Sequence, residues 1–145
     1  MLFTIGHSNK QIDEFINILK KNKIDVLVDV RSIPYSSWLP QFSKYELSKS
    51  LISSGIRYVW RGKNLGGKKE NVNYDEAIEE ISKLSKQQNV CIMCSEADPK
   101  KCHRYTKLTP SFMMKGVVPK HILWDNDDTI EPCNARDKSQ LMLFH

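Results

Sequence analysis

The 145-residue chain lacks any apolar run approaching the ~20 residues that a membrane-spanning helix needs. Its first residues, MLFTIGHSNK, contain no basic segment followed by an apolar stretch, so they do not resemble a secretion signal. Only four cysteines are present, too few for a disulfide scaffold in a chain of this length. These absences predict a protein with no membrane association that works in a reducing, cytoplasmic environment.

Two common nucleotide-binding signatures are also missing. The stretch GKNLGGKK is rich in glycine and lysine but is not a GxxxxGK[ST] loop, and no GxGxxG follows the first apolar run. Neither NTP hydrolysis nor dinucleotide binding is therefore expected, and no cofactor is predicted. Positive charge is in excess: the chain has 22 Lys and Arg against 17 Asp and Glu, which gives a net charge of +5. This modestly favours a polyanionic partner, although solvated surface lysines account for much of the excess.

Apolar and polar segments alternate along the chain, with no internal repeat or interdomain linker, so one domain over residues 1–145 is expected. Short apolar or β-branched runs predict five strands, at residues 2–5, 25–30, 56–60, 90–93 and 121–124. Apolar residues at helical spacing predict helices between them, at residues 12–19, 43–54 and 74–88, with another beginning near CHRYTKL. This alternation predicts an α/β fold, a small three-layer domain with a mainly parallel, Rossmann-like sheet of about five strands. Residues 125–145 are expected to form a tail that packs on the core.

Polar clusters follow three of the predicted strands: GHSN after the first, DVRS at the end of the second and CSEADPKKCHR after the fourth. In parallel sheets the ligand binds beyond the carboxyl ends of the strands, near the point where strand order reverses. The three clusters should therefore meet at one edge of the sheet. This edge is the predicted site.

The cluster CSEADPKKCHR admits three interpretations: a metal site, a redox pair or the rim of an anion-binding pocket. Cys91 and Cys94 have C-x-x-C spacing, but within a strand this spacing places the two sulfurs on opposite faces. No metal is therefore predicted, and a redox pair is disfavoured because such cysteines belong at a helix start. The pocket is favoured because Asp98 and Pro99 suit a helix start, where free N–H groups attract anions.

Other residues near this edge have both structural and functional interpretations. Asp29, at the end of a strand with Arg31 two residues later, is either half of a structural pair or a catalytic carboxylate. His7 is a single histidine, but it should face the same edge as Asp29 and Glu96. Four aromatic residues near this edge are interleaved with polar ones: Tyr35, Trp38, Phe42 and Tyr45. They either pack within a loop or form a surface on which a base stacks.

Taken together, TIGHSN, DVRSIPYS, LGG at residues 65–67 and CSEADPKKCHR resemble the motifs of the DUF488 family, in the same order and over residues 2–124. The resemblance implies an α/β domain with its motif residues in one pocket. It also implies similarity to enzymes of DNA-base repair, including those that remove oxidised thymine-type bases such as 5-hydroxymethyluracil.

The resemblance and the residues together predict a DNA glycosylase whose partner is duplex DNA that contains a damaged or modified base. Asp29, Glu96 and His7 are the expected catalytic residues. Residues expected to bind the substrate are Ser8, Asn9, Arg31, Ser32, Tyr35, Cys94, Cys102, His103 and Arg104. Residues expected to hold the DNA backbone are Lys44, Lys63, Lys100 and Lys101. Two alternatives remain, a non-catalytic nucleic-acid-binding module and a small-molecule enzyme with Cys94 or Cys102 as nucleophile.

Overall fold

The structure is a computed structural model, and it describes residues 1–125 and 129–130. The described strands form one six-stranded sheet in the order β3-β2-β4-β1-β5-β6, in which all neighbours are parallel except β5 and β6. The strand bounds are β1 Leu2–Gly6, β2 Val26–Asp29, β3 Arg57–Trp60, β4 Val90–Cys94, β5 Lys120–Ile122 and β6 Thr129–Ile130. The α-helix bounds are α1 Ile12–Lys21, α2 Lys44–Ser53, α3 Gly62–Leu65, α4 Tyr74–Ser85 and α5 Thr109–Met114.

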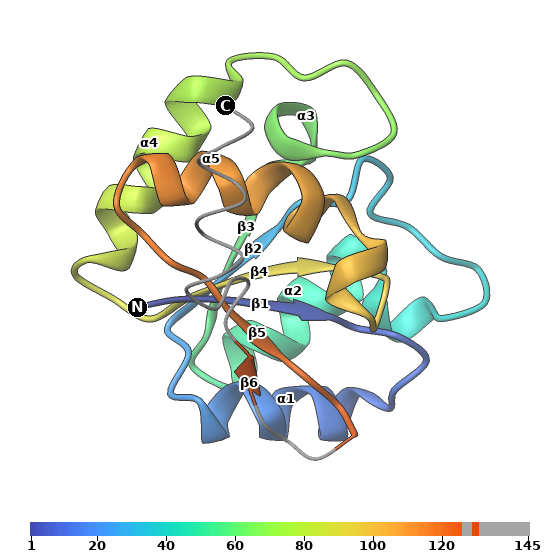
Figure 1. Ribbon diagram of the computed structural model, residues 1–145. Helices are drawn as coiled ribbons and strands as arrows, with labels where there is room; N and C mark the ends of the chain where they lie inside the picture. Colours follow the sequence, from blue (N-terminus) through green and yellow to red (C-terminus); the bar gives the residue numbers. More distant parts are fainter. Residues whose placement is uncertain (126–128, 131–145) are drawn as a thin grey trace.

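Helices cover both faces of the sheet and give a three-layer, Rossmann-like α/β domain (Figure 1). Helices α1 and α2 lie on one face, where Phe15 and Leu47 join the buried core with Cys91 of β4. Helices α4 and α5 lie on the other face, where Ile78 and Phe112 pack in a second core. Burying a side chain of this size contributes about 1.5–3 kcal/mol, so the two cores account for the helix positions. The predicted fold class is confirmed.

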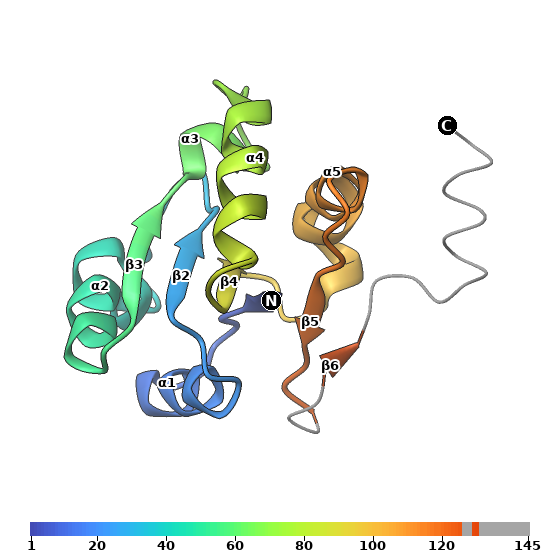
Figure 2. The same ribbon diagram turned by 90° about the vertical axis from the view of Figure 1, so that its left-hand side faces the viewer.

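The sheet brings the predicted site together because β2, β4 and β1 are neighbours, as Figure 1 shows; Figure 2 shows the same sheet turned by 90°. Parallel strands end at the same edge, and the register aligns Asp29 with Met93 and Gly6 with Cys94. The segments that follow these three strands therefore start side by side. They begin at His7, Val30 and Ser95.

The segment after β4 differs from the continuous helix that the sequence predicts. Asp98 does cap a helical start, since its Oδ1 accepts a hydrogen bond from Lys100 N at 3.0 Å. However, that start is a single 3-10 turn, η2 (Pro99–Lys101), and Cys102 is extended (φ −124°, ψ 147°). The chain then enters a π-helix, η3 (Arg104–Leu108), which leads into α5. The break turns Cys102 inward, which helical periodicity alone does not predict.

Two further differences concern short elements. The loop after β3 contains the one-turn helix α3, and a sixth strand, β6, pairs antiparallel with β5. The expectation that the 125–145 tail packs on the core falls mostly on residues 126–128 and 131–145, which lie outside the described residues. Within the described part, no helix is both long and apolar enough to cross a membrane.

His121 of β5 should make the fold sensitive to acid. Its side chain is fully buried, its Nδ1 contacts Thr4 Oγ1, and its Nε2 has no hydrogen-bond partner among the described residues. Burial and the positive charge of Arg104 lower the pKa of His121 to about 4, against an opposing effect of Cys102. The unfolded chain therefore takes up a proton below about pH 6.5, while the folded chain resists protonation down to about pH 4.

We therefore expect stability to fall as the pH drops through this window, with roughly 2 kcal/mol lost by pH 5 through this group. Urea unfolding at pH 7 and pH 5 measures the loss. The variant His121→Asn has no titrating ring, so it should be less stable at pH 7 but lose less on acidification. An equal pH dependence in both proteins would exclude His121 as the cause.

Candidate active site

A pocket of about 490 Å³ opens at the carboxyl edge of the sheet. Its walls come from the segments that follow β1, β2 and β4 and from the loop that follows α3. The lining includes three cationic side chains, one carboxylate, two histidines and two cysteines. The lining residues are His7, Arg31, Ser32, Ile33, Tyr35, Ser36, Leu39, Gly67, Lys68, Cys94, Ser95, Glu96, Lys101, Cys102 and His103.

Gly6 allows the first two walls to meet. A Cβ at this position would lie 1.6 Å from the carbonyl oxygen of Glu96, so the loop after β4 crosses directly over it. Backbone bonds extend the β1–β4 pairing past the strand ends, from His7 N to Cys94 O (2.8 Å) and from Ser8 N to Ser95 O (2.9 Å). Because Gly6 has no side chain, the loop that carries Glu96 can lie directly against the end of β1.

Asp29 lies beneath the pocket and not on its wall. It is fully buried, and both of its oxygens bind Arg31: Oδ1 accepts from Nε at 2.9 Å and Oδ2 from Nη2 at 2.8 Å. The Tyr58 hydroxyl also donates to Oδ2 at 2.6 Å. With its lone pairs engaged in this way, Asp29 holds the Arg31 guanidinium against the pocket wall and is not placed to contact a water or substrate there.

His7 is held in one tautomer. Its Nδ1 lies 2.7 Å from the carbonyl oxygen of Ser8, which only accepts, so Nδ1 carries the proton and Nε2 is bare in the neutral ring. Arg31 Nη1 lies 3.4 Å from that Nε2, and the ring stacks on Phe42 at 4.3 Å between centroids. Burial lowers the pKa of His7 to about 4. His7 is therefore neutral at physiological pH and acts as an acceptor.

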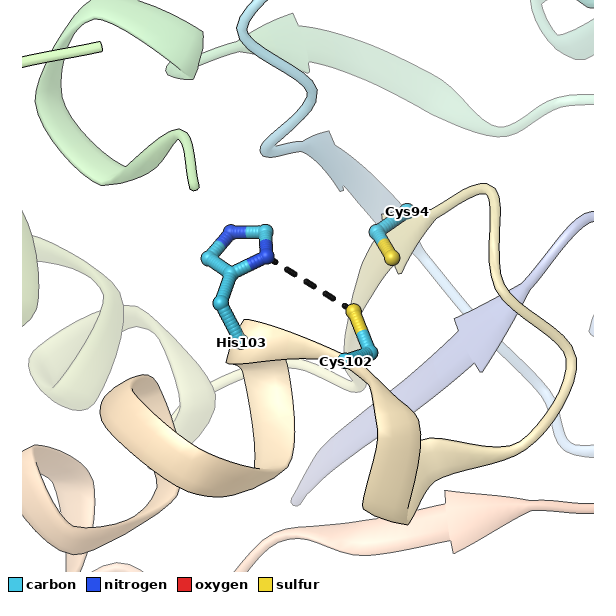
Figure 3. A group of neighbouring side chains, drawn as sticks. All are labelled: Cys94, Cys102 and His103. Carbon is cyan, nitrogen blue, oxygen red and sulfur yellow. Dashed lines mark hydrogen bonds between the residues drawn. The ribbon is translucent and has the colours of Figure 1, made fainter. Parts of the chain in front are cut away.

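Cys94, Cys102 and His103 form a group on the pocket wall (Figure 3). The interaction between the neighbouring Cys94 and Cys102 side chains lowers the pKa of Cys102 and raises that of Cys94. The ring Nδ1 of His103 lies 3.6 Å from Cys102 Sγ. Cys91, by contrast, faces the opposite core, so the predicted separation of Cys91 from Cys94 is confirmed. The spatial neighbour of Cys94 is Cys102.

Arg104, which the sequence predicts to bind the substrate, lies outside the pocket lining. It is fully buried, and its guanidinium donates to the carbonyl oxygens of Glu96 (2.7 Å) and Ala97 (3.3 Å) and to Thr4 Oγ1 (3.1 Å). It therefore ties the loop after β4 to β1. The π-helical turn that begins at Arg104 directs its side chain inward. The sequence suggests an exposed side chain instead, because Arg104 is a basic residue that follows two lysines.

Five other predicted residues lie outside the pocket lining. Ser8 and Asn9 follow His7 in the chain but do not line the cavity, and Ser8 has a left-handed backbone (φ 53°). Lys44 lies over the Trp60 ring at 4.6 Å from its centroid. Lys63 and Lys100 are exposed but do not line the cavity.

Sequence reasoning missed several lining residues, including Ile33, Leu39, Gly67 and Lys68. Gly67 packs closely against the ring of His103, since a Cβ there would lie 2.8 Å from Nδ1. Lys68 N donates to Ser32 Oγ at 3.0 Å, which closes the wall between the two loops. The signal that locates Gly67 and Lys68 is the LGGKK stretch, of which only LGG belongs to the family motif.

A family model described as "Domain of unknown function DUF488" matches residues 11–76 and 70–106, well over half of the chain. The chain belongs to the DUF488 family. The match includes Asp29, Arg31 and the whole CSEADPKKCHR segment, and it begins after the GHSN segment. No curated protein matches the chain. Apart from His7, every residue that lines the pocket lies within the matched segments, and the chemistry of the pocket must be argued from its residues.

Proposed function

We propose that this DUF488 domain is a DNA-base repair enzyme, a glycosylase that removes a modified base such as 5-hydroxymethyluracil from duplex DNA. One observation carries the proposal: a pocket of about 490 Å³ combines Arg31, Lys68 and Lys101 with the single lining carboxylate of Glu96. The volume lies within the range of about 300–1,000 Å³ typical of small-ligand sites. The cations can bind the phosphates of a nucleotide at the rim of the pocket. The base of that nucleotide can then enter the pocket, where the carboxylate lies.

The loop after β2 supports base extrusion. Three large side chains on it are strongly exposed: Ile33 (53%), Tyr35 (65%) and Trp38 (88%). Ile33 and Tyr35 also line the pocket. Enzymes that act on a base in a duplex extrude it into a pocket, and apolar side chains inserted between base steps help to unstack the duplex. The exposed apolar loop beside a basic pocket has the composition that this step requires.

In the proposed reaction, water adds to C1′ of the deoxyribose while the C1′–N bond breaks. The bonding electrons leave with the base, which finally gains a proton derived from the water, so that the products are an abasic site and the free base. Glu96 is the group that orients the water and stabilises the positive sugar in the transition state. Arg31, held by Asp29, faces the negative charge that develops on the departing base.

DNA binding should depend steeply on salt, because each phosphate contact releases condensed counterions. Changing Lys68 and Lys101 together to alanine removes two exposed cations from the pocket wall. We expect the slope of log Kd against log salt to fall by about 2 in magnitude, since each lost contact contributes roughly 0.9. Fluorescence anisotropy of a labelled duplex over a salt series measures it. The matched control is Lys86→Ala. Lys86 follows α4 at the opposite edge of the sheet, so this substitution should leave the slope unchanged.

A panel of duplexes, each with one modified base, tests the enzymatic proposal. Incubation with the protein should leave an abasic site in at least one duplex, detected as a strand break after alkali. Salt-dependent binding without any abasic site would instead favour a non-catalytic binding module. Activity that is abolished by a thiol alkylator but retained by Glu96→Gln would favour a cysteine-dependent enzyme.

A further inference from the structure

The group formed by Cys94, Cys102 and His103 offers three metal-ligating atoms at one point of the pocket wall. The two sulfurs and a ring nitrogen all lie within 4.8 Å of one another. Cys94 ends β4, while the extended backbone of Cys102 between η2 and η3 turns its sulfur towards that strand (Figure 3). Both cysteines are buried, with only 5% and 6% of their surfaces exposed. The end of β4 and the turn that follows η2 are thus gathered as a ligand set.

The His103 ring is oriented as a ligand. Its Nε2 lies 2.8 Å from the carbonyl oxygen of Leu65, which can only accept, so Nε2 carries the proton and Nδ1 keeps its lone pair in the neutral ring. That Nδ1 is the atom 3.6 Å from Cys102 Sγ. A metal-bound histidine characteristically donates its other N–H to a carbonyl or carboxylate, which fixes the tautomer. The close packing of Gly67 on the ring restricts its rotation further.

The spacing suits a four-coordinate ion. Tetrahedral zinc, with Zn–S near 2.3 Å and Zn–N near 2.05 Å, places its ligand atoms about 3.5–3.8 Å apart. The distance between His103 Nδ1 and Cys102 Sγ is 3.6 Å, and the widest separation in the group is at most 4.8 Å. Closing the remaining gap needs a movement of about 1 Å. Rotation of a cysteine side chain about its Cα–Cβ bond can supply this movement.

We propose that Cys94, Cys102 and His103 form a binding site for a thiophilic divalent metal ion, with zinc the best match, and that its fourth position faces the pocket. Two thiolates balance the charge of the ion, and Arg104 Nη1 donates to Cys94 Sγ at 3.5 Å as an outer contact. Two sulfurs and one imidazole, with one position open, form the ligand set of a catalytic zinc site. Such an ion polarises an oxygen that occupies the open position. The metal site goes beyond the proposed function, which needs no metal.

Cobalt(II) and zinc(II) binding to the full, tag-free chain tests the site. Cys133 lies outside the described residues, so it is changed to serine in every protein compared. The Cys133→Ser parent should bind one equivalent of cobalt, with thiolate-to-cobalt charge-transfer absorption that zinc abolishes. Cys94→Ser, Cys102→Ser and His103→Gln should each weaken zinc binding more than tenfold in competition with a chromophoric chelator. Cys91→Ser is the matched control, a buried cysteine on the other face of the sheet, and should change the affinity less than twofold.

A second measurement needs no substitution in the cluster, in case those variants fold poorly. Saturating zinc should slow iodoacetamide alkylation of Cys94 and Cys102 more than tenfold, as mapped by peptide mass spectrometry. Equal alkylation rates with and without zinc, or a Cys94–Cys102 disulfide that forms in saturating zinc, would overturn the proposal. Absence of the charge-transfer band would also overturn it. These readouts do not involve base release, so they stand apart from the success or failure of the glycosylase assay.

Discussion

Asp29→Asn is expected to lower the free energy of unfolding by about 3–5 kcal/mol, the usual cost of removing one partner of a buried ion pair. Arg31 is 8% exposed and Asp29 is fully buried, and the carboxylate accepts from Arg31 Nε, Arg31 Nη2 and the Tyr58 hydroxyl. An amide retains the shape but not the charge, and its NH₂ group opposes a donor at one of these contacts. The guanidinium is then left buried without its counter-charge.

Urea unfolding followed by circular dichroism measures the effect of Asp29→Asn. Glu80→Gln is the matched control, because Glu80 also binds an arginine, Arg61, through both carboxylate oxygens but at the surface. Exposed pairs contribute about 0–1 kcal/mol, so this variant should lose little. A comparable loss in both variants would mean that Asp29 does not hold Arg31 as the structure indicates. In the base-release assay Asp29→Asn should also be impaired, since Arg31 is no longer fixed.

Glu96→Gln is expected to lower the single-turnover rate of base release by about 10²–10⁴-fold, the usual contribution of a positioned acid or base. The fold should be unaffected because Glu96 is exposed, and Oε1 can still accept from Asp98 N, which lies at 3.1 Å. The substitution replaces the other carboxylate oxygen by an NH₂ group and removes the negative charge. DNA affinity should remain within a few-fold of wild type, because the cations of the pocket are intact.

Quench-flow analysis of a duplex with one modified base gives the rate, and anisotropy gives the affinity in parallel. Glu70→Gln, an exposed carboxylate outside the pocket lining, is the control and should leave both unchanged. Near-normal release by Glu96→Gln would remove its assigned role. A matching loss of DNA binding would show that Glu96 acts in recognition and not in the chemical step.

The sequence predicts the fold well because the central strands β1, β2 and β4 are buried on both faces and therefore read as nearly continuous apolar runs, as in VLVD and VCIMC. The elements that it misses are too short to carry a period. Helix α3 has four residues and β6 has two. The π-helix that begins at Arg104 is missed because its residues also fit an ordinary helix.

The structure shows which of the predicted site residues gather at one edge of the sheet, and the individual roles stay predictions. The rule that ligands bind at the carboxyl ends of parallel strands places His7, Arg31 and Glu96 at one edge, where all three line the pocket. Nothing in the sequence separates Asp29, which lies underneath, from Glu96, which lies on the wall. How deeply each carboxylate is buried depends on how the three loops after β1, β2 and β4 cross. The spacing of residues along the sequence does not encode that crossing.

The cysteines show the same limit. C-x-x-C spacing draws attention to Cys91 and Cys94, yet the alternation of a strand separates them, as expected. The contact between Cys94 and Cys102 depends on the single extended residue between η2 and η3. A one-residue break of this kind leaves no periodic signal, so the ligand set emerges only in three dimensions.

Mass-spectrometric detection of the released base is the most direct test of base removal by this pocket. A single-turnover reaction is run on duplexes that carry one 5-hydroxymethyluracil or another base of the panel, with wild type and Glu96→Gln side by side. Wild type should release one free base for each abasic site formed, and Glu96→Gln should release it at least a hundredfold more slowly. If wild type binds these duplexes but releases no base from any of them, the domain is not a glycosylase for the bases tested.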